Sequence, residues 1–342
     1  MTSLGAQAGG KAEPAGRVAR RGTPEPPLPT FPVEFATPDI SPWLEGNIGL
    51  RGFTSLQSGH PGPHVCITAV THGNEIAGAV ALDRMLRAGL QPSRGTLTLG
   101  FINLAAFARF DPANPTLSRF ADEDFNRLWD PEMLDSTRRS QELDRAREIR
   151  PLIDTVDVLL DLHSMLWPSD PLTLCGTSAR GRDLALAIGS PALVVADEGH
   201  VTGPRLIDYP RFLAPNGDAT AVLVEAGQHW ENATVATTQA AIAGLLRHLK
   251  LVEPDWLRVL DDGTPHHPPQ RVAEVTAVIT AASGAFRFEQ NYRGGDIIPS
   301  AGTLIAHDGD TEIRTPHDDC LLVMPTLRPS RGHTVVRLAR FV

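Results

Sequence analysis

His72 and Glu75 lie three residues apart, at a spacing that would let both bind one metal ion. They follow an apolar run, residues 64–70, which is short, rich in β-branched side chains and bounded by proline and glycine, as is typical of a buried strand. Ligands of α/β sheets bind at the carboxyl ends of the strands. The pair is therefore a candidate metal site, although a surface histidine and a first-turn glutamate favoured by the helix dipole would show the same spacing.

A second histidine, His163, follows another apolar run at residues 156–160. Alone, it would be better explained as a hydrogen-bonded core histidine. Two histidines and a glutamate at strand ends, however, form the His₂Glu set of catalytic zinc sites, and such ligands suit zinc better than magnesium or calcium. We therefore expect one zinc ion per chain. Asp161, two residues before His163, either orients a ligand or is a structural aspartate, and both roles remain open.

Glu225 is the candidate general base. It follows the apolar run at residues 221–224 and precedes Ala226 and Gly227, so it also lies near a strand end. A carboxylate in that place could accept the proton of a water molecule activated by the metal and pass it to the leaving group. An exposed loop glutamate is the alternative.

Arg119, Asn126 and Arg127 are candidate anion-binding residues between two of the ligand motifs. An arginine fork binds a carboxylate through two parallel hydrogen bonds, and a neighbouring asparagine amide adds a donor. The same arginines could instead pair with the acidic residues 122–124 on a solvated surface.

The candidate residues lie in a region, residues 40–252, where apolar runs alternate with helical stretches. Strands are expected at residues 64–70, 96–103, 156–160, 193–196 and 221–224, and helices at residues 75–88, 141–154 and 235–250. Buried strands that alternate with helices predict an α/β fold, a three-layer α/β/α sandwich around a mostly parallel or mixed sheet. We expect this region to be the catalytic domain.

Three further segments flank this domain. Residues 1–30 contain almost no large apolar side chain and are expected to form a disordered tail. Residues 253–270 are rich in proline, aspartate and histidine, which favours a linker. Over residues 271–342 helical periodicity disappears and short apolar runs are separated by glycine, aspartate and proline, which predicts a small all-β C-terminal domain.

The composition excludes several classes of protein. The 342 residues include 31 Lys and Arg against 40 Asp and Glu, and the formal net charge of −9 argues against a nucleic-acid partner. Three widely spaced cysteines without a Cys-x-x-Cys pair exclude a disulfide scaffold or a thiolate zinc site and indicate a reducing compartment. Apolar runs are too short for a signal peptide or a membrane span. We expect a cytoplasmic protein that does not bind a membrane.

The ordered motifs resemble the succinylglutamate desuccinylase/aspartoacylase family of the zinc-carboxypeptidase clan. The resemblance is carried by Thr71-His72-Gly73-Asn74-Glu75, by Arg119 with Asn126-Arg127, by Asp161-Leu162-His163 and by Val224-Glu225-Ala226-Gly227. The order and spacing of these motifs cover roughly residues 60–230, and residues 271–342 resemble the carboxy-terminal domain of the family.

The resemblance implies a zinc-dependent amidohydrolase, a deacylase that hydrolyses the amide bond of a small N-acyl amino acid. The three candidate ligands would hold the zinc ion, and water activated by the metal would attack with Glu225 as general base and acid. Arg119 would polarise the scissile carbonyl and stabilise the oxyanion. Asn126 and Arg127 would hold the α-carboxylate of the amino acid.

In members of this family the carboxy-terminal domain closes over the cleft and excludes long peptides. Residues 289–292 resemble the stretch of that domain that lends a tyrosine to the site, so the resemblance makes Tyr292 a candidate substrate contact. A structural tyrosine in a β turn is equally compatible with the sequence.

One departure from the family concerns the choice of substrate. Aspartoacylases bind the side-chain carboxylate of the substrate with an arginine, and neither Arg205 nor Arg211 lies at a matching offset from Glu225. Leu166-Trp167-Pro168 would give an apolar wall if it lines the cleft. We therefore expect an acyl or side-chain group that is not a second carboxylate.

Two alternative functions remain compatible with the sequence. A metallocarboxypeptidase acting on short peptides would use the same residues, but the additional β domain should restrict access. A catalytically silent ligand-binding protein could share the fold, but it would need neither Glu225 nor Arg119.

Overall fold

An eleven-stranded mixed sheet is the framework of the computed structural model, which describes residues 31–200, 202–260 and 269–342. The strand order is β1-β3-β2-β4-β7-β5-β6-β8-β14-β13-β10. The strands are β1 (Phe53–Gln57), β2 (His64–Ala69), β3 (Thr96–Phe101), β4 (Val158–Met165), β5 (Leu172–Leu174), β6 (Leu193–Ala196), β7 (Thr220–Gln228), β8 (Arg271–Thr280), β10 (Ile297–Ile298), β13 (Cys320–Val323) and β14 (Thr334–Phe341). The expected tail at residues 1–30 and residues 261–268 of the expected linker lie outside the described residues.

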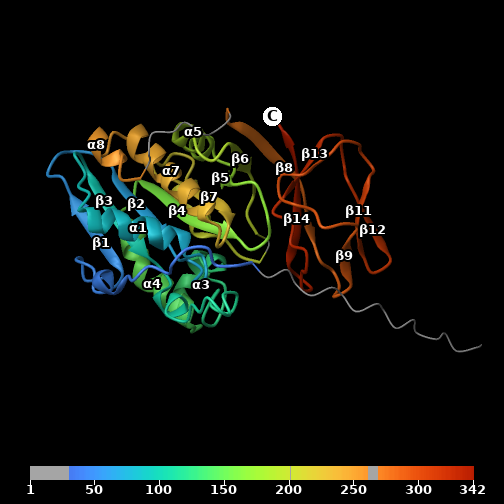
Figure 1. Cartoon of the computed structure of the whole chain (residues 1–342), viewed down its shortest axis with the longest axis horizontal. Coiled ribbons are helices and arrows are strands. Elements are labelled where there is room, and N and C mark those ends of the chain that lie inside the picture. The colour runs from blue at the N-terminus through green and yellow to red at the C-terminus, as the bar shows by residue number, and fades with distance from the viewer. Residues whose placement is uncertain (1–30, 201, 261–268) are drawn as a thin grey trace, which may run out of the picture. The chain divides into compact units, whose positions relative to one another are not determined.

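Helices cover both faces of the part of this sheet that precedes β8. The helices are α1 (Ala77–Ala88), α2 (Leu104–Phe107), α3 (Pro131–Asp135), α4 (Gln141–Ile153), α5 (Ala179–Ile188), α6 (Pro210–Leu213), α7 (Asn232–His248) and α8 (Pro254–Leu257), with 3₁₀ turns η1 (Ser41–Trp43), η2 (Phe125–Arg127) and η3 (Leu206–Asp208). Apolar residues of α1, α5 and α7 share one buried cluster with Val65 and Ile67 of β2. Those of α4 share the cluster on the other face with Cys66 (Figure 1). The predicted three-layer α/β/α sandwich is confirmed.

The central strands β2, β4 and β7 are parallel, and two of them are longer than the apolar runs that predicted them. β4 continues to Met165 and β7 to Gln228. His163 and Glu225 therefore lie inside the strands rather than beyond their ends, and they are paired residues in the β4–β7 register. The apolar pattern stops earlier than the backbone ladder because these side chains are polar groups of the candidate site, and backbone pairing does not depend on side-chain type.

The C-terminal region begins with β8 at Arg271, where the β-rich domain was expected to start. β8 pairs in parallel with β6 and antiparallel with β14, so the large sheet continues into this region. A separate antiparallel sheet consists of β9 (Phe286–Phe288), β11 (Leu304–Asp308) and β12 (Thr311–Arg314). The long connection between β6 and β8 hides this pairing from local sequence patterns. The short helix α8 lies within the segment that was expected to be a linker.

The cysteines and the lengths of the apolar helices bear on the expectations drawn from the composition. The three cysteines are free and buried, in agreement with a chain that does not depend on disulfides. Within the described ranges, no helix is both long enough and apolar enough to cross a lipid bilayer.

Gly244 of α7 is required by the close packing of α7 on α5. A Cβ atom at this position would lie 2.0 Å from the carbonyl oxygen of Ile188. Gly244→Ala should therefore lower the free energy of unfolding by about 1–3 kcal/mol, although alanine favours a helix by about 1 kcal/mol. Denaturant unfolding measures the difference. Gly284→Ala is the matched control, because a Cβ there meets no atom within 4 Å; equal midpoints for the two variants would contradict this packing argument.

Candidate functional site

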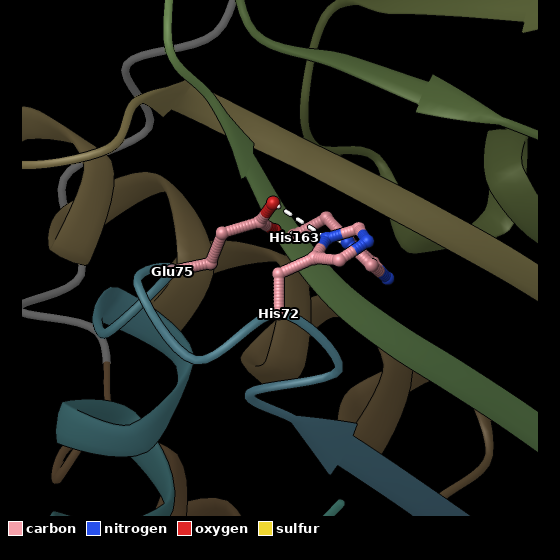
Figure 2. Close-up of side chains that lie close together, drawn as sticks. All are labelled: His72, Glu75 and His163. Atoms are coloured by element: carbon pink, nitrogen blue, oxygen red, sulfur yellow. Dashed lines mark hydrogen bonds and ion pairs between the residues drawn. The ribbon is translucent and has the colours of Figure 1, made fainter. Parts of the chain in front are cut away.

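His72, Glu75 and His163 form a buried cluster that could hold a metal ion. His72 and Glu75 come from the loop between β2 and α1, and His163 comes from β4. One ligand atom from each residue lies within 4.8 Å of the others. Figure 2 shows the three side chains turned toward one another. His72 Nδ1 lies 2.7 Å from Glu75 Oε1, and His163 Nδ1 lies 2.9 Å from Glu75 Oε2. Two imidazole nitrogens and a carboxylate are a donor set that zinc accepts.

The second nitrogen of each imidazole is held by an aspartate. Asp124 Oδ1 lies 2.9 Å from His72 Nε2, and Asp161 Oδ2 lies 2.8 Å from His163 Nε2. These contacts orient both rings so that their Nδ1 atoms face the cluster, as carboxylates behind metal-binding histidines do. Asp161 therefore contacts a candidate ligand, which is one of the two roles that the sequence left open.

The role of Asp124 was not foreseen. In the sequence it is one of three adjacent acids, residues 122–124, that could pair with the arginines on a solvated surface. The structure separates them: Asp122 accepts hydrogen bonds from the Gln141 backbone and side chain, Glu123 pairs with Arg138, and only Asp124 reaches the cluster. Three consecutive acidic residues look alike in the sequence, and the loop conformation decides which one faces inward.

Charges in the cluster are strongly coupled. Burial opposes ionisation of Glu75, but His72 and His163 lower its pKa well below the usual range. Burial likewise opposes ionisation of Asp124, and His72 and Arg119 lower its pKa well below the usual range. Both carboxylates are therefore anionic, so Glu75 offers an ionised oxygen donor to a divalent cation.

Glu225 differs from these carboxylates. It is buried, and its Oε2 atom has no hydrogen-bond partner within the described residues. Burial, reinforced by the charge of Glu75, raises the pKa of Glu225 to about 8. A carboxyl group that is close to its proton-exchange point near neutral pH and has an unpartnered oxygen is suited to general acid–base chemistry. The alternative of an exposed loop glutamate is excluded by its burial.

Arg119 contacts the cluster directly. It donates hydrogen bonds to Glu75 Oε1 and to Asp124 Oδ2, each at 3.2 Å. Arg127 lies farther out: its Nη2 atom is 3.9 Å from Asp124 Oδ2, and its Nη1 donates to the Asn126 carbonyl oxygen at 2.6 Å. The expected pairing of both arginines with an acidic neighbour is thus observed at Asp124, in the site rather than on a solvated surface. Burial lowers the pKa of Arg127 to about 10, so it remains charged at neutral pH.

Asn126 has one side-chain atom committed to the fold. Its Oδ1 accepts a hydrogen bond from the Leu206 amide at 2.7 Å, and its Nδ2 lies 3.5 Å from His163 Nε2. Only the amide NH₂ group can therefore donate to a ligand.

Glu142 of α4 anchors the loop that carries these groups. Its carboxylate accepts hydrogen bonds from the backbone amides of Ala121 (2.5 Å), Asp122 (3.0 Å) and Glu123 (3.2 Å). The side chain is fully buried, so the loop between Arg119 and Asp124 is fixed by an acceptor on the helix that was expected at residues 141–154.

A cavity of about 620 Å³ opens onto the cluster. Its walls include Arg119, Asn126, Arg127 and Glu225, and the segment Leu166–Pro168 lines it as the sequence had suggested. The C-terminal region contributes residues 324–326, 332–334 and Arg337 to the same walls. The cavity is thus built from both parts of the sheet.

Tyr292 lies elsewhere. It is buried in the apolar cluster of the C-terminal region with Ile305, Leu322 and Val336, and its ring packs edge-on against Phe288 at 5.6 Å. It is not among the described residues that line the cavity. This placement corresponds to the structural role that the sequence left open.

Two arginines in the cavity wall were not identified from the sequence as parts of the site. Arg337 comes from β14, near the end of the chain, and Arg205 begins η3. Arg205 had been considered for its position in the sequence and set aside. Arg211, considered with it, instead donates to the Val156 carbonyl oxygen and lies 3.5 Å from Asp157. No local pattern marks Arg337, because it lies inside an ordinary β-strand.

His229 is a further cavity residue that sequence analysis missed. Its Nδ1 lies 2.8 Å from Ser164 Oγ, and burial lowers its pKa to about 3, so the ring is neutral. It lies at the end of β7, four residues beyond Glu225, and this proximity to a strand end was the available signal.

The fold and the site define an α/β protein with a candidate metal centre at the carboxyl ends of its central strands. The model of the succinylglutamate desuccinylase/aspartoacylase catalytic domain matches residues 61–249. The chain belongs to this family of hydrolases.

Solved structures of the same fold agree with this assignment. Succinylglutamate desuccinylase from Vibrio parahaemolyticus is 18% identical with a TM-score of 0.61, and 85% of this chain and 86% of that chain are covered. A succinylglutamate desuccinylase/aspartoacylase from Rhodobacter sphaeroides is 19% identical with a TM-score of 0.61, covering 85% and 88%. The product-bound ectoine utilization protein EutE (DoeB) from Ruegeria pomeroyi is 16% identical with a TM-score of 0.58, covering 84% and 88%. A comparison with curated proteins gave no match.

Asp161→Asn tests the orientation of His163. The Asp161 carboxylate also accepts hydrogen bonds from the Thr68 and Thr71 hydroxyls, and an amide cannot accept on both sides. Zinc affinity should fall about 10–100-fold, as measured by competition with a chromophoric chelator. Asp157 lies just before the same strand, and its carboxylate accepts a hydrogen bond from the His64 backbone amide. Asp157→Asn is the control and should leave the zinc affinity unchanged. Equal affinities for the two variants would show that Asp161 does not support a metal ligand.

Proposed function

We propose that the protein hydrolyses the amide bond of a small N-acyl amino acid and releases a carboxylate and a free amino acid. The observation that carries this proposal is the unpartnered, buried carboxyl group of Glu225 beside the His₂Glu cluster, at the wall of a cavity lined by arginines. The membership of the chain in a family of desuccinylases and aspartoacylases supports it.

We propose His72, Glu75 and His163 as the ligands of one zinc ion. The donor set, its burial and the aspartates behind both imidazoles fit this metal. When bound, zinc supplies Lewis acidity, which polarises an amide carbonyl and lowers the pKa of a water molecule toward neutrality.

Different residues of the chain carry out proton transfer, oxyanion stabilisation and substrate binding. Glu225 accepts the proton of the attacking water at its free oxygen and delivers it to the amide nitrogen as the carbon–nitrogen bond breaks. Arg119 directs its guanidinium to the oxyanion of the tetrahedral intermediate. Arg127, with the Asn126 amide group, binds the α-carboxylate and so places the amide bond beside Glu225.

A metallocarboxypeptidase acting on short peptides is the second candidate from the sequence. The walls contributed by residues 324–326, 332–334 and Arg337 favour a small substrate, because they bound the same cavity that the catalytic groups line. We propose that the β-rich C-terminal domain, residues 271–342, limits access in this way. The free, buried cysteines support a reducing compartment, and we propose the cytoplasm.

Glu225→Gln removes the proton acceptor and keeps the shape of the side chain. The kcat for N-acyl amino acid hydrolysis by the zinc-loaded protein should fall about 10²–10⁴-fold, while the affinity for substrate, measured by calorimetry, is retained. Glu231→Gln, at the exposed N-terminus of α7, is the control. Undiminished hydrolysis by the Glu225 variant would refute the proposed mechanism.

Arg127→Met tests the binding of the α-carboxylate. Loss of a charged hydrogen bond of about 1.5–3 kcal/mol should raise KM about 10–100-fold, with a smaller change in kcat. Arg138→Met removes an arginine whose partner, Glu123, belongs to the same loop but lies outside the cavity, and should leave KM unchanged. A similar KM for both variants would contradict the assignment of Arg127.

A further inference from the structure

Arg205 and Arg337 face the cavity but are already bound to carboxylates of the chain. Both arginines line the cavity, and their side chains are 1% and 3% exposed. Arginines in such a place are the groups that would bind an acidic part of a substrate. Whether they can do so depends on the charges behind them.

Asp197 binds both arginines. Its two oxygens accept from Arg205 Nη2 at 2.8 Å and Nη1 at 3.1 Å, a fork-to-fork pair. Its Oδ2 also accepts from Arg337 Nε at 3.1 Å. Burial opposes ionisation of Asp197, but Arg205 and Arg337 lower its pKa below the usual value, so the shared carboxylate is anionic.

Asp208 completes the set of partners around Arg205. It accepts from Arg205 Nε at 2.7 Å and from Nη2 at 3.0 Å. Each nitrogen of this guanidinium is therefore committed to Asp197 or Asp208. The remaining contact of Arg337 is with the ring of His200, whose Nε2 lies 3.1 Å from Nη2. Burial and the charge of Arg337 lower the pKa of His200, so the ring adds no charge.

The charges in this wall therefore balance. Two guanidinium groups stand against the carboxylates of Asp197 and Asp208, whereas Arg127 has only a 3.9 Å approach to Asp124. The guanidinium group of Arg127 can therefore still donate hydrogen bonds to the α-carboxylate of a substrate. A second carboxylate beside Arg205 and Arg337 would meet guanidinium groups whose charges are already offset, and it would be buried without a counter-charge of its own, which is unfavourable.

Another part of the cavity wall is apolar. Met165, Leu166, Trp167 and Pro168 follow His163 along the chain and line the cavity, together with Leu223 of β7. An uncharged hydrocarbon group gains from burial against such side chains.

We propose that Asp197 and Asp208 set the substrate class: N-acyl amino acids that carry a single carboxylate and whose acyl and side-chain groups are uncharged and largely apolar. Asp197 and Asp208 together bind all three nitrogens of Arg205, and Asp197 also binds Nε of Arg337, so the two carboxylates offset the charges of both guanidinium groups. This inference rests on the proposed function, because it concerns the same cavity.

The substrate class is tested by measuring hydrolysis by the wild-type protein of paired substrates that have the same shape and differ in charge. N-acetyl-L-leucine and N-acetyl-L-aspartate have side chains with the same branching that differ in charge. N-(4-methylpentanoyl)-L-leucine and N-succinyl-L-leucine give the same comparison in the acyl group. We expect kcat/KM to be at least tenfold higher for the uncharged member of each pair. Equal or reversed preferences would overturn the inference.

Binding to the Glu225→Gln variant, measured by calorimetry, separates this inference from the proposed function. Tighter binding of the uncharged ligands supports the inference even if the wild type hydrolyses none of the four compounds, which would refute the proposed function alone. If N-acetyl-L-aspartate binds more tightly than N-acetyl-L-leucine, the inference about the substrate class is overturned. The proposed hydrolytic function is not affected by that result.

Asp197→Asn tests the role of the shared carboxylate. The amide keeps the shape and removes one negative charge, so the ratio of kcat/KM for aspartate over leucine substrates should rise at least tenfold. Asp208→Asn, at a more exposed side chain (12% against 1%), should shift the ratio in the same direction and provides a second variant if the first does not fold. Glu198→Gln removes the same charge from an exposed neighbour outside the cavity and should leave the ratio unchanged. An unchanged ratio in both aspartate variants would overturn the proposal.

Discussion

The Glu75 carboxylate is the contact on which the rest of the site depends. Its two oxygens face the Nδ1 atoms of His72 and His163, and one of them also accepts the Ser164 amide. A single buried anion thus ties the loop after β2 to the middle of β4. Asp124 and Asp161 bind the other nitrogen of each imidazole, so every nitrogen of the two buried rings has a partner.

This geometry explains why neighbouring carboxylates have different properties. Glu75 and Asp124 contact cationic or imidazole partners and are anionic, whereas Glu225 lacks a partner at Oε2 and is buried beside the charge of Glu75. The surroundings of each carboxylate, and not its residue type, therefore decide whether it supports the metal site or is suited to proton transfer. The same principle operates elsewhere in the cavity wall, where Asp197 forms ion pairs with Arg205 and Arg337 and offsets the charge that would attract an anionic ligand.

The candidate site was predictable to the extent that its residues lie in local motifs. His72, Glu75 and His163 follow apolar runs, and the α/β alternation predicts that strand ends meet at one edge of the sheet; the structure brings these three residues together. Local patterns did not predict the full length of the strands, because backbone pairing continues where the apolar side chains stop. β4 and β7 extend past their apolar runs. For Tyr292 the sequence left a substrate contact and a structural role open, and its ring lies in an apolar cluster.

The sequence by itself determined the fold class, the order of the ligand motifs and the types of chemical group available, because periodicity and turn residues act over a few neighbouring positions. Only the tertiary structure decided which of three consecutive acids supports His72, that β8 continues the sheet of β6, and that Arg337 meets Asp197 across 140 positions of the chain. Such contacts are fixed by packing of distant segments and by the need to pair every buried charge. Neither requirement leaves a local pattern that can be read along the chain.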